Sequence, residues 1–351
     1  MQSHATRSIV ASLVTLLILG LPLSRAAAQQ PQPQTFLKTI AGFSDGDLSD
    51  LDKGQVVVNL LKSPDNQDVA AIGSVRIKGS ADAGIDAFRN IVSWKKGAGI
   101  ASVGKFGNPP QAADFQALSM DPKDFQDLKN CKPGDCKSKF SAAEIARIKA
   151  IDLGAPEAKS QVDALQREIL AEEGKAYLTG GMPTLPPYAD KSKPQDRAAA
   201  FQSLLGNSQW LMEYLPALDT YLGGYPNASL PNHEDLFVWS QEKFGLKPVT
   251  RLTHLIILTR ESAPGVKAYA IAQKHIYNNH YFQAGLEMAA IRPDGQGGFY
   301  LTGLTRYRTD PATGMMAGAI RGQIRDGVKG NLQNNLERIQ KRLQTGNSGA
   351  M

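Results

Sequence analysis

The chain has 351 residues, of which 42% are hydrophobic, and a formal net charge of +6. This hydrophobic content is ample for a buried core, and the length allows one large domain or two small ones. Lys and Arg are scattered among Asp and Glu rather than concentrated in one patch, so we expect no nucleic-acid partner.

Residues 1–28 have the pattern of a secretory signal peptide. Arg7 precedes an apolar run over Ile9–Leu23, and the small residues Ala26-Ala27-Ala28 follow. A basic segment, a short apolar segment and an A-x-A site are typical of a cleaved export signal. The run is shorter than the ~20 residues that a membrane anchor, the alternative, would need. We therefore expect a periplasmic or secreted soluble protein, and its mature charge would be +4 because two arginines would leave with the signal.

The N-terminal part is predicted to alternate short strands and helices. Residues 29–53 are expected to be a Gln/Pro-rich linker that ends in a short acidic helix. Two strands around a Pro-Asp-Asn turn then predict a hairpin, and Ser80 can cap the helix that follows. The predicted elements are the helix Asp45–Asp52, the strands Gln55–Lys62 and Val69–Lys78, the helix Ala81–Val92 and the strand Ile100–Phe106.

The two cysteines, Cys131 and Cys136, flank the sequence Lys-Pro-Gly-Asp. Pro-Gly is a turn dipeptide that brings its flanks together, and an exported protein meets an oxidising compartment. We predict a disulfide, which in the chain-entropy model would stabilise the fold by roughly 2 kcal/mol. A redox pair or half of a metal site are the alternatives, but two cysteines alone cannot form a structural zinc site and the spacing is not C-x-x-C.

A helical segment is predicted over about residues 155–231, between two β-rich parts. Its apolar residues recur at helical spacing. The predicted helices are Pro156–Thr179, Pro194–Leu205 and Ser208–Gly223, the last interrupted at Pro216.

The C-terminal part is predicted to contain long strands followed by one long helix. β-branched and aromatic residues favour the strands Asp235–Phe244, Pro248–Thr259, Lys267–Ile291 and Gly298–Thr309. The helix should run from near Met316 to about Leu343, with an apolar stripe of Ile320, Ile324, Val328, Leu332, Leu336, Ile339 and Leu343. Such a stripe needs a continuous apolar partner, which a curved sheet would supply. Residues 346–351 are expected to be a disordered tail.

This order of elements resembles the START-like or SRPBCC helix-grip superfamily over roughly Gly54–Leu343, without any motif match. The resemblance implies an antiparallel sheet around the C-terminal helix, with an apolar cavity between them. We therefore predict an α+β fold: a helix-grip-like domain over residues 54–345 with a helical insertion at about 155–231. The stretches 131–136, 239–248 and 275–282 also resemble an uncharacterised exported bacterial family, which implies no activity.

The residues expected to contact a ligand lie on the C-terminal strands. Leucines mixed with a few polar groups are typical of a small-molecule cavity, although a filled core is the alternative. Gln273, His275 and Tyr277 should share one strand face, as should Leu252 and His254. The candidate ligand-binding residues are Leu252, His254, Gln273, His275, Tyr277, Tyr281 and Arg306.

Signals for catalysis and metal binding are weak. The sequence has no nucleophile elbow, phosphate-binding loop or H-E-x-x-H motif, so we name no catalytic residue and no cofactor. His275 and His280 are five residues apart and fall on opposite strand faces unless a bulge intervenes, so we expect no metal site. Glu242 could pair across the sheet with an arginine such as Arg306.

The predicted function is binding of an apolar or amphipathic, lipid-like small molecule between the sheet and the last helix. One alternative is an enzyme, for instance a hydrolase, that uses His275 or His280 with Glu242. The other is a structural or interaction protein of the cell envelope. A transient contact with a membrane surface and the oligomeric state stay open.

Overall fold

One eight-stranded antiparallel sheet organises the fold, with the strand order β1-β2-β8-β7-β6-β5-β4-β3. The computed structural model describes residues 33–97, 99–244, 247–311 and 317–345. The predicted signal peptide and C-terminal tail lie outside these residues. The strands are β1 (Val57–Leu61), β2 (Asp68–Lys78), β3 (Ile100–Lys105), β4 (His233–Phe244), β5 (Lys247–Ala263), β6 (Val266–Asn278), β7 (Phe282–Pro293) and β8 (Gly298–Thr309).

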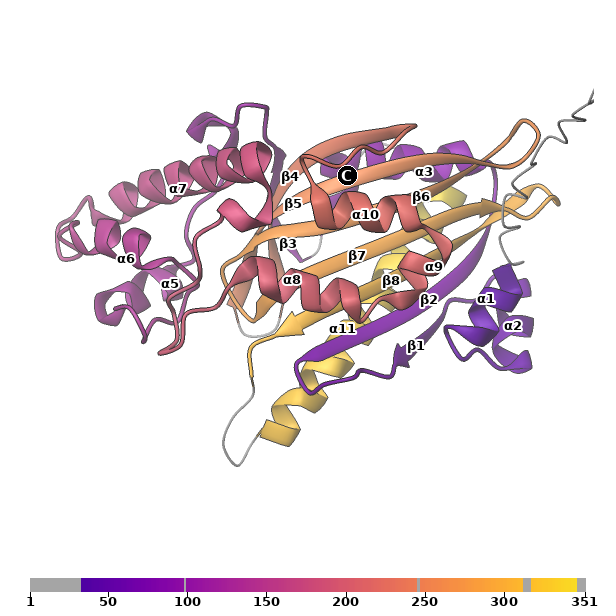
Figure 1. Cartoon of the computed structure of the whole chain (residues 1–351), viewed down its shortest axis with the longest axis horizontal. Coiled ribbons are helices and arrows are strands. Elements are labelled where there is room, and N and C mark those ends of the chain that lie inside the picture. Colours follow the sequence, from indigo (N-terminus) through magenta and orange to yellow (C-terminus); the bar gives the residue numbers. More distant parts are fainter. Residues whose placement is uncertain (1–32, 98, 245–246, 312–316, 346–351) are drawn as a thin grey trace, which may run out of the picture. The chain divides into compact units, whose positions relative to one another are not determined.

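The helices cover both faces of the sheet (Figure 1). They are α1 (Pro33–Thr39), α2 (Asp45–Asp52), α3 (Ala81–Arg89), α4 (Ile91–Lys95), α5 (Pro122–Asp127), α6 (Ala142–Lys149), α7 (Ala158–Gly180), α8 (Arg197–Gly206), α9 (Gln209–Tyr214), α10 (Pro216–Gly224) and α11 (Ala317–Gln344). The α+β fold with a C-terminal helix against the sheet is thus confirmed, and the arrangement is compatible with a helix grip.

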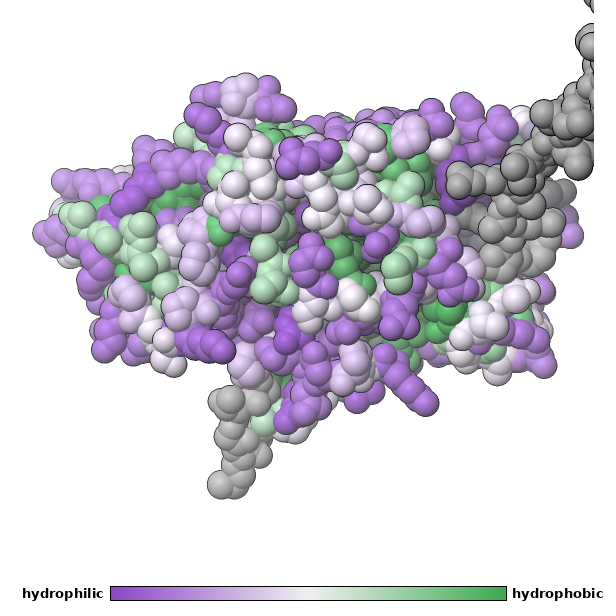
Figure 2. Space-filling model, in the orientation of Figure 1, coloured by the Kyte–Doolittle hydropathy of each residue, from purple (hydrophilic) through white to green (hydrophobic). Residues whose placement is uncertain are grey.

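Strand alternation produces two apolar cores. On one face, Leu252 and Ile256 pack with α7 to α10, which come from the predicted insertion; we call this the insertion face. On the other, the α11 face, Leu255 and Ile257 share a core with α3, α4 and α11. The insertion therefore supplies a second helical layer. Figure 2 views the side of α8 to α10 and shows polar and apolar residues interspersed there.

α11 lies close to the sheet because two glycines make room for it. Gly73 of β2 and Gly303 of β8 are paired across the strands on the α11 face. A Cβ atom at either position would come within 2.9 Å of Leu336 or Leu332 of α11. Most of the predicted stripe is confirmed, since Val328, Leu332 and Leu336 are buried and Ile324, Ile339 and Leu343 pack against them. Ile320 is an exception, because it is 40% exposed.

The predicted strand Lys267–Ile291 is wrong, because it consists of two strands, β6 and β7. The chain turns between them through residues 279–281, where Tyr281 takes a φ of 61°. This turn contains no glycine or proline, so the run of strand-forming residues hides it.

β6 also carries a bulge that reverses its faces. Thr253 pairs with His275, and the neighbouring Leu252 pairs with Tyr277, which leaves Ile276 extra. An extra residue shifts the alternation by one. The expected common face of His275 and Tyr277 is therefore wrong: Tyr277 packs in the insertion-face core, and His275 points to the α11 face.

Two other segments bear on the sequence predictions. Within the expected N-terminal linker, α1 forms, and Leu37 and Phe43 are buried in the insertion-face core. The predicted disulfide between Cys131 and Cys136 is present. Among the described residues, we find no helix with the length and apolarity that crossing a membrane requires.

Candidate functional site

A cavity of about 430 Å³ lies between the α11 face of the sheet and the helices α4 and α11. This is where the helix-grip resemblance places a cavity. Its apolar wall consists of Phe88, Ile91, Trp94, Ala289, Leu301, Leu332, Leu336 and Ile339. Its floor is polar, which the resemblance did not lead us to expect.

Neighbouring strands supply the polar floor. Arg251 of β5, Gln273 of β6, Glu287 of β7 and Tyr307 of β8 project from the same face and line the cavity. Glu287 Oε1 accepts a hydrogen bond from the Tyr307 hydroxyl (2.5 Å) and lies 3.2 Å from Arg251 Nη1. Arg251, Glu287 and Tyr307 therefore form a connected network, and Gln273 lies beside it.

Glu242 of β4 joins this network at the end of the cavity near α4. Its Oε1 lies 2.5 Å from Lys95 Nζ, and its Oε2 accepts a hydrogen bond from Arg251 Nη1 at 3.2 Å. Burial alone would raise the pKa of Glu242, but the charges of Lys95 and Arg251 outweigh it and lower the pKa to about 2. Burial is likewise outweighed at Glu287, where a hydrogen bond from His275 and the charge of Arg251 hold the pKa below its usual range. Both carboxylates are thus ionised near neutral pH.

α11 supplies a polar strip along the mouth of the cavity. Asn331, Asn334, Asn335 and Arg338 line it at spacings of three and four residues, which places them on one helical side. The three asparagines are exposed, and Arg338 is partly buried. Sequence reasoning missed this strip, although the same periodicity that revealed the apolar stripe beside it was available.

Of the predicted ligand-binding residues, Gln273 lines the cavity and His275 lies behind it. His275 Nε2 is 3.4 Å from Glu287 Oε1. The ring fits because β7 has a glycine opposite, where a Cβ on Gly285 would lie 2.3 Å from His275 Nδ1. Burial, followed by the charge of Arg251, lowers the pKa of His275 and favours its neutral form.

The other predicted residues lie elsewhere. His254 is in the insertion-face core, where its Nδ1 meets the Tyr177 hydroxyl at 2.8 Å and its Nε2 meets Asp235 Oδ1 at 2.9 Å. The remaining four are Leu252, buried in the same core; Tyr277, whose hydroxyl donates to the Lys139 carbonyl; Arg306, paired with Asp68; and Tyr281, whose hydroxyl accepts from the Lys247 amide. The proposed Glu242–Arg306 pair is therefore wrong, because Arg306 faces the insertion side.

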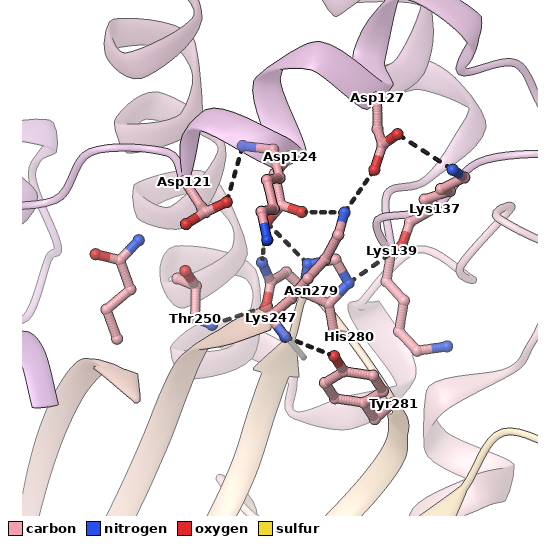
Figure 3. Close-up of polar contacts among 12 residues, drawn as sticks. Asp121, Asp124, Asp127, Lys137, Lys139, Lys247, Thr250, Asn279, His280 and Tyr281 are labelled. Carbon is pink, nitrogen blue, oxygen red and sulfur yellow. Dashed lines mark hydrogen bonds and ion pairs between the residues drawn. The ribbon is translucent and has the colours of Figure 1, made fainter. Parts of the chain in front are cut away.

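His280 belongs to a separate polar cluster at the end of the sheet (Figure 3). Its Nε2 lies 2.8 Å from Asp124 Oδ2 of α5, and its Nδ1 lies 3.1 Å from the Lys137 carbonyl beside the disulfide. Lys247 bridges Asp124 and Asp127 at 2.6 Å each. Burial would raise the pKa of Asp124, but the hydrogen bonds and charges of His280 and Lys247 lower it. His280 therefore links the β6–β7 turn to α5 through Nε2 and to the segment after the disulfide through Nδ1.

No protein-family model and no curated protein sequence matches the chain significantly. The helix-grip resemblance therefore rests on the arrangement of the sheet and α11. The function is therefore inferred from the size and lining of the cavity.

Proposed function

We propose that this is an exported protein that binds an amphipathic small molecule in the cavity between the sheet and α11. The observation that carries the proposal is the cavity itself, about 430 Å³ with an apolar wall and a charged floor. Pockets of this size and mixed lining are typical of small-molecule sites. The disulfide supports export, because such bonds persist in oxidising compartments.

The polar floor favours an amphipathic ligand over a wholly apolar one. Lys95 and Arg251 offset the charges of Glu242 and Glu287, but hydrocarbon over the floor would remove water from a Glu287 carboxylate whose two oxygens are not both hydrogen-bonded by described residues. Glu287 accepts its contacts through Oε1, and no described residue hydrogen-bonds to its Oε2. A hydroxyl or amide N–H on the ligand would satisfy that oxygen.

Acid–base catalysis is less well supported. A general acid or base works best with a pKa near the working pH, whereas the pKa values of both cavity carboxylates are lowered. His280, the other candidate, contacts Asp124 and Lys137 rather than the cavity groups. The cavity therefore supports binding better than proton transfer.

The proposal is tested by ligand uptake. Protein purified from its export compartment should release a co-purified amphiphile on solvent extraction, and should take up the neutral dye Nile red. Ala289→Phe places a ring in the cavity from its apolar wall, so we expect it to lower dye affinity by about tenfold or more while the protein stays folded.

The matched control is Ala263→Phe, the same change at an exposed position near the β5–β6 turn. It should bind dye like the wild type. Wild-type protein that releases no amphiphile and binds no dye would contradict the proposal, as would undiminished binding by folded Ala289→Phe protein.

A further inference from the structure

The charges around the cavity do not balance. Lys95 pairs with Glu242 at 2.5 Å, and Arg251 lies 3.2 Å from both Glu242 and Glu287. These two cations and two carboxylates compensate one another. Arg338, at the mouth, adds a third cation. Lys243 also lines the cavity, but its side chain is exposed, so solvent screens its charge.

Arg338 forms no ion pair with any carboxylate among the described residues, and its one hydrogen bond within them is to Asn335 Oδ1 at 2.9 Å. A guanidinium carries five N–H donors, so most of its donors are unused by those residues. Its surroundings also disfavour an isolated charge, because burial and then the neighbouring Arg342 lower the pKa of Arg338, and the charge of Glu242 offsets them only in part. An anion at this position would compensate the charge and engage the donors.

We propose that the ligand carries a carboxylate that binds Arg338 at the cavity mouth, while its apolar body packs against Trp94, Leu332 and Leu336. This rests on the proposed binding function and specifies its ligand class as an acidic amphiphile. A carboxylate fits because it is a monoanion, which matches one excess positive charge, and because its two oxygens match the planar guanidinium fork. The asparagines beside Arg338 offer further donors to the same head group.

The test compares ligands with the same tail and different heads. Decanoate, decylammonium and 1-decanol compete with Nile red for the wild-type protein at neutral pH. We expect decanoate to bind most tightly. Arg338→Gln should weaken decanoate by about tenfold, the loss of one charge-assisted contact, and decanol by less than about twofold. Arg325→Gln, which removes an exposed arginine of α11 outside the cavity, should change neither.

The outcomes separate this proposal from the one on which it rests. Decanol binding as tight as decanoate binding would overturn the carboxylate assignment and leave the binding function standing. Equal losses for decanoate and decanol in Arg338→Gln would also overturn it, because they would show a change in cavity shape. If none of the three ligands competes and the wild type takes up no dye, the binding function itself fails and the head-group assignment fails with it.

Discussion

At the scale of single residues, Lys274 is a buried cation with no carboxylate partner among the described residues. It lies on β6, its side chain is buried in the insertion-face core, and its ammonium donates to the Leu222 carbonyl at 2.7 Å. The group also lies over the rings of Phe201 and Tyr177, and no described carboxylate pairs with it. Burial lowers the pKa of Lys274 to about 7.

This lysine should make stability depend on pH above neutrality. The pKa in the unfolded chain is ~10.4, so between about pH 7 and pH 10 the unfolded state binds more protons than the folded state. The cost of burying the charge is thus complete below about pH 7 and declines as the pH rises. Lys274→Met keeps a similar volume, and we expect it to raise stability at pH 6 by roughly 2 kcal/mol, with a smaller gain at pH 9.

Thermal melting at the two pH values checks this prediction. Lys267→Met, at an exposed position of the same strand, is the control and should shift the melting temperature little at either pH. A gain for Lys274→Met that is independent of pH would show that the ammonium is not what the substitution relieves.

The sequence did not predict the contacts that depend on strand order and on the register between strands. Glu242, Arg251 and Glu287 lie on three different strands, and their meeting depends on a strand order that local patterns do not encode. Tyr277 is separated from His275 by one extra residue at Ile276, which periodicity alone cannot reveal. By contrast, Cys131 and Cys136 were predictable, because the turn between them is local.

At the scale of elements, the position of α11 depends on two strand residues that have no side chain. The paired glycines Gly73 and Gly303 let Leu332 and Leu336 approach the backbone. The apolar periodicity predicted α11 and most of its buried side. It could not predict where the helix would lie. In a sequence, a glycine within a strand indicates a weaker strand, and nothing nearby in the chain shows that the glycine makes room for a helix.

Gly303→Val tests this close approach. β propensity alone would favour valine at a strand position. The new Cβ would lie 2.9 Å from Leu332 Cδ1, however, so we expect a loss of ~1–3 kcal/mol from overpacking. Denaturant unfolding of Gly303→Val, Leu332→Ala and the double variant measures the coupling. The double variant should lose less than the sum of the single losses, whereas additive losses would mean that the two side chains do not meet.

At the scale of the whole molecule, buried charges tie the helical insertion to the sheet. Arg197 of α8 pairs with Glu173 of α7 and donates to the Ile276 carbonyl at the β6 bulge, 2.8 Å away. Glu144 of α6 lies beside this pair, and its Oε2 accepts a hydrogen bond from the Ser141 amide at 2.7 Å. Three helices and one strand therefore meet around one compensated charge cluster, which the sequence did not foretell because its members are far apart along the chain.

Glu144 gives this junction a pH dependence opposite to that of Lys274. Burial, followed by the charge of Glu173, raises the pKa of Glu144 to about 7. The pKa in the unfolded chain is ~4.3, so between about pH 4 and pH 7 the folded state binds more protons. The stabilising contribution of the protonated carboxyl is complete below that interval and is lost as the pH rises through about 7.

Glu144→Gln should remove this loss. An amide mimics the neutral carboxyl, and glutamine can still complete the capping box with Ser141. We expect the gain of the variant over the wild type in free energy of unfolding to be larger at pH 8 than at pH 5 by roughly 2 kcal/mol. Denaturant unfolding at both pH values measures the difference, with Glu168→Gln, at an exposed position of α7, as the control. Glu144→Gln protein that is no more stable than the wild type at pH 8 would contradict this prediction. Such a result would mean that Arg197 compensates the ionised Glu144 carboxylate, rather than that Glu144 is held neutral beside Glu173.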